Sequence, residues 1–174
     1  EPILPGVTVR DFWTWALGDL RLNTNWGMLA QFLDARAVGD DRPRDDRWGN
    51  FDVLTPEGVR VEVKSSGYLQ SWGQPRPSRI AFSGLLGLSW SAETGYSAEP
   101  EVRADVFVYA VHTRQDPGVY DPLDLDAWAF YVLPGSTVRR LGQKFLRLSR
   151  VRALTPPPTP WAGLRSAVLL AAER

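Results

Sequence analysis

A tight turn between two strand-like stretches most constrains the fold of this chain. Residues 59–64 (VRVEVK) alternate between apolar and polar side chains, which is the period of a strand with one buried face. The stretch 50–55 (NFDVLT) precedes them, and PEG at 56–58 forms a turn between the two. The pattern predicts a hairpin. In its second strand, one face carries Val59, Val61 and Val63, and the other carries Arg60, Glu62 and Lys64.

Further strands and two helices are expected around this hairpin. Residues 102–111 (VRADVFVYAV) and 127–133 (AWAFYVL) are rich in β-branched and aromatic side chains and predict two more strands. A helix is expected over 25–38, with its cap at Asn23–Thr24 and its end at Gly39, and another over 161–173. This order predicts an α/β (α+β) fold, with a central mixed sheet flanked by helices.

Apolar patterns also predict the core. Four apolar side chains of the helix 25–38 form one stripe at helical spacing, namely Met28, Leu29, Phe32 and Leu33. Four of the eight tryptophans lie on apolar patterns and are expected in the core: Trp13, Trp15, Trp26 and Trp128. Asp105 is expected to fix the start of the strand that follows it.

Length and composition limit the classes of protein to consider. The 174 residues suit a single domain over 1–174. The absence of cysteine excludes disulfides, zinc–thiolate sites and thiol nucleophiles, and the one histidine, His112, excludes a histidine-rich metal site. No stretch is apolar enough to span a membrane, and residues 1–9 lack the pattern of a signal peptide. We therefore expect no membrane association and a cytoplasmic location.

The use of lysine is selective. The chain has 18 arginines and two lysines, Lys64 and Lys144, and its net charge is zero. The neutral charge removes the argument that a basic surface makes for nucleic acid binding. Lysine at position 64 fits a chemical need for a compact ammonium instead of a planar guanidinium.

The hairpin carries the residues that indicate chemistry. Asp52 lies on the first strand, and Glu62 and Lys64 lie two residues apart on the second, so the latter two share a face. Two carboxylates on one face repel unless a cation joins them, and such oxygen ligands suit Mg²⁺ or Mn²⁺. The alternative is an ordinary half-exposed strand with charged side chains on its solvent face.

The spacing Asp52-(x9)-Glu62-x-Lys64 across a hairpin resembles the signature of the PD-(D/E)XK nuclease superfamily. The resemblance covers about residues 20–135 and leaves 136–174 as a C-terminal extension. It implies a restriction-endonuclease-like core, Mg²⁺ or Mn²⁺ held by Asp52 and Glu62, a catalytic Lys64 and a DNA substrate. It further implies a role near the metal for Gln70. The alternative is that Gln70 is an ordinary loop amide that makes hydrogen bonds to the backbone.

The resemblance also implies an acidic residue on the preceding helix, where this chain has Gln31. Three explanations stay open: activity survives without that acid, the enzyme is weakened or inactive, or Gln31 is an amide at the helix edge outside the site. The first predicts a Mg²⁺-dependent DNA endonuclease. The second predicts a nuclease-fold module that binds nucleic acid or protein without turnover.

Residues around the hairpin are the candidate contacts to nucleic acid. They are Arg44, Arg47, Trp72 and Arg76. A long insert over 84–101 carries Leu85, Leu86, Leu88 and Trp90, which would suit an apolar contact in a homodimer.

Overall fold

A mixed four-stranded sheet forms the centre of the protein, with strand order β3-β4-β8-β9. The computed structural model describes residues 2–43, 51–88, 90–91, 93, 95–97 and 99–174. β3 pairs antiparallel with β4, β4 parallel with β8, and β8 antiparallel with β9, so the predicted mixed sheet and the predicted hairpin are both confirmed. The strands of this sheet are β3 (Val53–Leu54), β4 (Arg60–Gly67), β8 (Val106–His112) and β9 (Trp128–Pro134).

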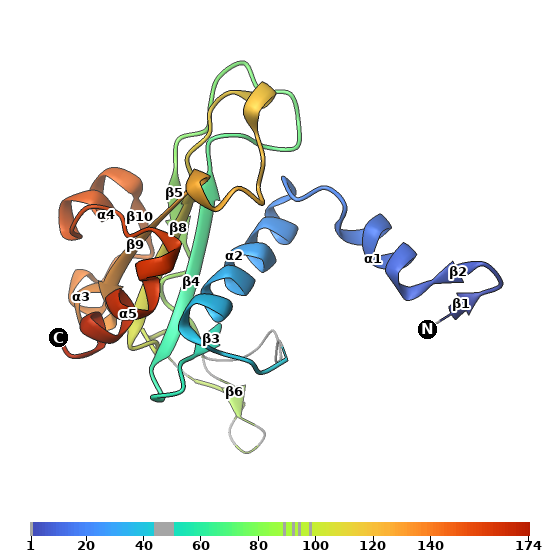
Figure 1. Cartoon of the computed structure of the whole chain (residues 1–174). Coiled ribbons are helices and arrows are strands. Elements are labelled where there is room, and N and C mark those ends of the chain that lie inside the picture. Colours follow the sequence, from blue (N-terminus) through green and yellow to red (C-terminus); the bar gives the residue numbers. More distant parts are fainter. Residues whose placement is uncertain (1, 44–50, 89, 92, 94, 98) are drawn as a thin grey trace.

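The other helices and strands lie outside this sheet (Figure 1). The helices are α1 (Val9–Leu17), α2 (Asn23–Val38), α3 (Gly135–Leu141), α4 (Leu148–Leu154) and α5 (Leu164–Ala172). Short 3₁₀ turns are η1 (Pro117–Val119), η2 (Leu125–Ala127) and η3 (Trp161–Gly163). The remaining strands are β1 (Pro2–Leu4), β2 (Val7–Thr8), β5 (Ala81–Ser83), β6 (Trp90–Ser91), β7 (Gly95–Tyr96) and β10 (Phe145–Arg147).

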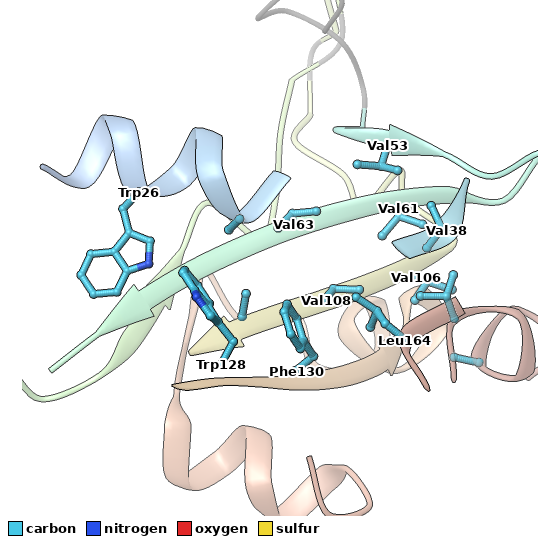
Figure 2. Packing of buried hydrophobic residues seen from close by; sticks show 14 residues of the cluster. Trp26, Val38, Val53, Val61, Val63, Val106, Val108, Trp128, Phe130 and Leu164 are labelled. Atoms are coloured by element: carbon cyan, nitrogen blue, oxygen red, sulfur yellow. The ribbon is translucent and has the colours of Figure 1, made fainter. Parts of the chain in front are cut away.

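Two hydrophobic clusters cover the two faces of the sheet. The first cluster lies between the sheet and helices α2 and α5, and it includes Val61, Val63 and Trp128, as Figure 2 shows. The second cluster lies between the sheet and the layer made by α3, α4 and the β5–β10 pair, and it includes Phe107 and Tyr109. Because α5 supplies Leu164, Val168 and Ala171 to the first cluster, the core extends well past residue 135.

The buried face of α2 differs from the expected stripe. Trp26, Ala30, Asp34 and Val38 are buried at a spacing of four residues, which places them on one side of the helix. Leu29 and Leu33 pack at the edge of the first cluster, as predicted. The prediction for Phe32 was wrong, because its side chain is 58% exposed and lies against the guanidinium of Arg36.

The N-terminal segment projects from the body of the protein (Figure 1). Its helix α1 has no buried residue, and Trp13 and Trp15 are 56% and 84% exposed. The prediction that these two tryptophans are core residues was therefore wrong, while Trp26 and Trp128 are buried as predicted. An apolar pattern predicts an amphipathic helix, but it does not say whether another element covers the apolar face.

Asp105 fixes the start of β8, as predicted. Its carboxylate accepts hydrogen bonds from the backbone amide and the guanidinium of Arg60, at 3.0 and 2.6 Å. These bonds lower the pKa of Asp105. His112 ends the same strand, and its side chain is fully buried. None of the helices formed by the described residues is both long and apolar enough to cross a bilayer.

Candidate functional site

The alternation of β4 decides where the candidate residues lie. Val61 and Val63 belong to the first cluster, under α2. Glu62 and Lys64 therefore lie on the opposite face, where they pair in register with Phe107 and Tyr109 of β8. β3 is the edge strand next to β4, so that side of β4 stays open wherever β3 ends.

Asp52 lies at the point where β3 separates from β4. Its backbone amide donates to the carbonyl of Val61 at 2.9 Å, which keeps the chain beside β4 for one more residue. Its Oδ2 accepts a hydrogen bond from the amide of Val63 at 2.7 Å. The carboxylate thus takes the place of a backbone carbonyl and contacts the residue that separates Glu62 from Lys64.

Gln31 holds the other oxygen of Asp52. The Nε2 of Gln31 donates to Oδ1 of Asp52 at 2.6 Å, across 21 residues of sequence. This bond brings Gln31 of α2 into direct contact with Asp52. In this arrangement the amide offers Asp52 its N–H group.

Glu62 and Lys64 form an ion pair with a distance of 2.6 Å between Nζ and Oε1. Their side chains are 21% and 20% exposed, so the pair is shielded but reachable from solvent. Glu62 also lines a small pocket of about 90 Å³ together with Gly84 and Arg103. Burial raises the pKa of Tyr109, and the charge of Glu62 adds to this shift, which places the carboxylate close to that phenol.

Sequence reasoning missed a buried acid, Asp34. Its side chain is fully buried on the inner face of α2, one turn from Gln31, and neither carboxyl oxygen has a hydrogen-bond partner among the described residues. Burial raises the pKa of Asp34 well above its ordinary value, and the negative charge of Asp52 raises it further. The sequence offered one signal, since Asp34 follows Gln31 by three residues and so lies near it on the helix. A carboxylate is usually exposed, however, and the sequence gives no reason to expect this one in the core.

The carboxylates of Asp52 and Glu62 have their hydrogen-bond partners on different sides of β4. Asp52 bonds toward α2, whereas Glu62 pairs with Lys64 on the other face of β4. The backbone of Val63 is the structural link between these two pairs. Within the described ranges, no three or more acidic, histidine or cysteine side chains gather closely enough to hold a metal ion by themselves.

Gln70 and Trp72 lie at a different place, beyond the C-terminal end of β4. The side-chain amide of Gln70 donates to the carbonyl of Gly67 at 3.4 Å. Gln70 and Trp72 each line two adjoining pockets. Trp72 is 58% exposed, and Arg76 is exposed but lines neither pocket. Arg44 and Arg47 lie outside the described residues.

The apolar insert packs mostly inward. Leu85 is 2% exposed, so the expected use of this leucine in a dimer contact was wrong. Leu86 is partly buried and packs against the second cluster. Leu88 is 51% exposed. The structure does not describe the side chain of Trp90.

Comparison with models of known protein families and with curated protein sequences finds no match to this chain.

Proposed function

We propose that this protein is a metal-dependent phosphodiesterase that cuts DNA, with Asp52, Glu62 and Lys64 as its catalytic residues. One observation carries the proposal. The carboxylate of Asp52 bonds the backbone amide of Val63, which is the residue between Glu62 and Lys64. The Asp52 carboxylate therefore lies against the backbone of β4 between Glu62 and Lys64, while the side chains of these two residues lie on the face of the strand turned away from α2.

The donor set suits a hard divalent ion. Asp52 and Glu62 would supply carboxylate oxygens, and water and substrate phosphate would fill the other positions, as is usual for Mg²⁺ or Mn²⁺. Such an ion, when bound, activates water as a nucleophile and neutralises charge on the phosphoryl group. Because the protein would supply only two carboxylates, the remaining ligands of the ion would come from water and the substrate.

Lys64 would donate a hydrogen bond to the attacking water or to a phosphate oxygen. It now donates to Glu62, so binding of a cation by Glu62 would release the ammonium for this role. Gln31 would keep Asp52 oriented through the bond to Oδ1. Because an amide carries no charge, we expect weaker metal affinity than a glutamate at position 31 would give.

The experiment is cleavage of plasmid and of single-stranded DNA with Mg²⁺ or Mn²⁺, and with EDTA as the metal-free control. Lys64→Ala should lower the rate by about a hundredfold or more, because it removes a donor to developing charge. Lys144→Ala is the matched control, since Lys144 is the other lysine of the chain and is exposed. Cleavage that survives EDTA, or that Lys64→Ala leaves unchanged, contradicts the proposal.

A second candidate is a binding module that uses this fold without turnover. The observation that favours it is that both carboxylates already have partners in the protein: Gln31 for Asp52 and Lys64 for Glu62. Calorimetry with Mn²⁺ separates the two candidates. Heat of binding that Asp52→Asn removes supports the enzyme, and no binding at millimolar Mn²⁺ supports the module.

Substitution of Gln31 by glutamate tests the same question from the other side. The new carboxylate would lie within hydrogen-bond distance of Asp52, so the two charges repel unless a cation joins them. Gln31→Glu should lower thermal stability in EDTA and tighten Mn²⁺ binding about tenfold. No change in either quantity would place position 31 outside the metal site.

A further inference from the structure

Two adjoining pockets form a trough at the C-terminal end of β4. One has a volume of about 660 Å³ and the other about 420 Å³, and Gln70 and Trp72 line both. In Figure 1 this end of the molecule holds the loops that follow β4 and β8, above the N-terminal end of α2. We call these two pockets together the trough. Each pocket falls in the size range of a small-molecule or nucleotide site.

The walls of the trough contain buried polar atoms without partners. Among the described residues, no hydrogen-bond partner reaches Nε1 of Trp26, Oε1 of Gln70 or the hydroxyl of Tyr120. Each of these side chains lines one or both pockets, and Trp26 is only 2% exposed. Figure 2 shows Trp26 beside the arrowhead of β4, which is the end where the trough lies. These three atoms are buried, and an unpaired buried polar atom is destabilising.

The N-terminus of α2 opens into the smaller pocket through Asn23. Its N-cap residue, Leu22, makes no side-chain cap, and the first turn of α2 contains no acidic residue. The amides at the start of such a helix attract an anion. Arg79 lines the same pocket and adds a positive charge to it.

Charge and shape indicate what the trough binds. Of the described residues that line it, Asp19 is the one acid, and it is neutralised by Arg21 at 3.1 Å. Trp72 offers a half-exposed ring on which a base can stack. A stacking ring, polar edges and an anion site match the base and phosphate of an unpaired nucleotide, whereas a duplex keeps its bases stacked inside.

The strand that carries Glu62 and Lys64 also supplies part of the wall of the trough. Ser66 lines the smaller pocket and lies on the same face of β4 as Lys64 and Glu62, because the three alternate by two residues. We propose that the trough binds a single-stranded nucleic acid, stacked on Trp72 with a phosphate at the start of α2, and delivers it to Lys64. The proposal rests on the proposed function for its last step only.

The test is fluorescence anisotropy of a labelled oligothymidylate of about ten nucleotides, measured in EDTA so that metal-dependent cleavage does not interfere. Trp72→Ala should weaken binding about tenfold, which is the usual effect of removing a stacking ring. Trp15→Ala is the matched control, since Trp15 is more exposed and lies on α1, outside the trough. Arg79→Ala should reduce the salt dependence of binding, while Arg150→Ala, on α4, should not.

Two outcomes would overturn the proposal: equal affinity of wild type and Trp72→Ala, or tighter binding of a duplex of the same length than of the single strand. These outcomes are separate from failure of the proposed function. Binding in EDTA that depends on Trp72, without cleavage under Mg²⁺ or Mn²⁺, keeps the trough and removes the enzyme. Cleavage that Lys64→Ala abolishes, without any effect of Trp72→Ala on binding, does the reverse.

Discussion

Replacement of Gly67 by alanine tests how α2 packs on the sheet. Gly67 ends β4, directly beneath the ring of Trp26. A Cβ at this position would lie 1.8 Å from Cη2 and 2.3 Å from Cζ2 of that ring. These separations are far below van der Waals contact, so either the ring or the strand must move. The result depends on whether Trp26 has room to do so.

Trp26 has little room. It is 2% exposed, and three aromatic rings surround it, with centroids 5.8 Å away for His112, 6.1 Å for Tyr120 and 6.0 Å for Trp128. Overpacking of a core usually costs about 1–3 kcal/mol. Because the clash involves ring atoms enclosed on several sides, we expect the top of that range, about 3 kcal/mol. For a chain of this length, this loss lowers Tm by roughly 6–12 °C.

Urea unfolding followed by circular dichroism measures the effect. The midpoint of unfolding should fall in Gly67→Ala, with no change in the slope of free energy against urea. Gly73→Ala is the matched control, because a Cβ at Gly73 meets no atom within 4 Å. Trp26→Phe should suppress part of the loss in the double variant, since the smaller ring lacks the clashing atoms. Equal midpoints for wild type and Gly67→Ala would refute the packing of Trp26 on β4.

Three further predictions address charge and exposure. The folded protein keeps the proton of Asp34 at pH values where the unfolded chain, with an ordinary pKa of 3.8, loses it. The free energy of unfolding should therefore fall as pH rises above about 4, by up to about 1.4 kcal/mol per pH unit. Urea titrations at several pH values should show this slope in the wild type and not in Asp34→Asn. Asp105 has a lowered pKa, so its bond to Arg60 stabilises the fold above about pH 4 and is lost in more acidic solution; Asp105→Asn should cost about 0.5–1 kcal/mol at pH 7, and the difference from wild type should shrink below pH 4. Trp15→Ala should shift Tm by less than about 1 °C, whereas Trp128→Ala should cost about 3 kcal/mol or more, measured by thermal unfolding. An unchanged pH slope in Asp34→Asn, a constant difference for Asp105→Asn, or a large effect of Trp15→Ala would each contradict the corresponding assignment.

The partners of the candidate catalytic residues bear on the proposed chemistry. Asp52 and Glu62 each accept a hydrogen bond from a side chain that a cation would displace or reorient, Gln31 and Lys64 respectively. Asp34 adds a buried carboxyl whose pKa depends on the charge of Asp52. Neutralisation of Asp52 by a cation would weaken this coupling. A cation bound at Asp52 would therefore lower the pKa of Asp34 toward its ordinary value.

Much of the fold was predictable because its signals are local. The alternation in residues 59–64 depends only on the two-residue period of a strand, and it correctly separated Val61 and Val63 from Glu62 and Lys64. The turn at 56–58 correctly predicted the antiparallel pairing of β3 with β4. The order of helices and strands was enough to predict a mixed sheet with helices on its faces.

The orientation of helices was harder to predict. On α2, Leu29 and Leu33 touch the first cluster, but Phe32 faces solvent and Asp34 faces the interior. The sequence favours the opposite assignment for both, because a phenyl ring usually lies inside and a carboxylate outside. The rotation of the helix follows from the ring of Trp26, which fits over the bare backbone of Gly67 on a strand far along the chain.

By itself, the sequence determined the strand that carries Glu62 and Lys64, the turn before it and the side of that strand on which the two side chains lie, because each follows from the geometry of neighbouring residues. Only the tertiary structure decided that Asp52 bonds the amide of Val63, that Gln31 holds Asp52, and that Asp34 is buried beside them. Asp52 and Val63 are 11 residues apart in the sequence, and Gln31 and Asp52 are 21 residues apart. These contacts depend on how α2 settles on the sheet, and no local pattern specifies that.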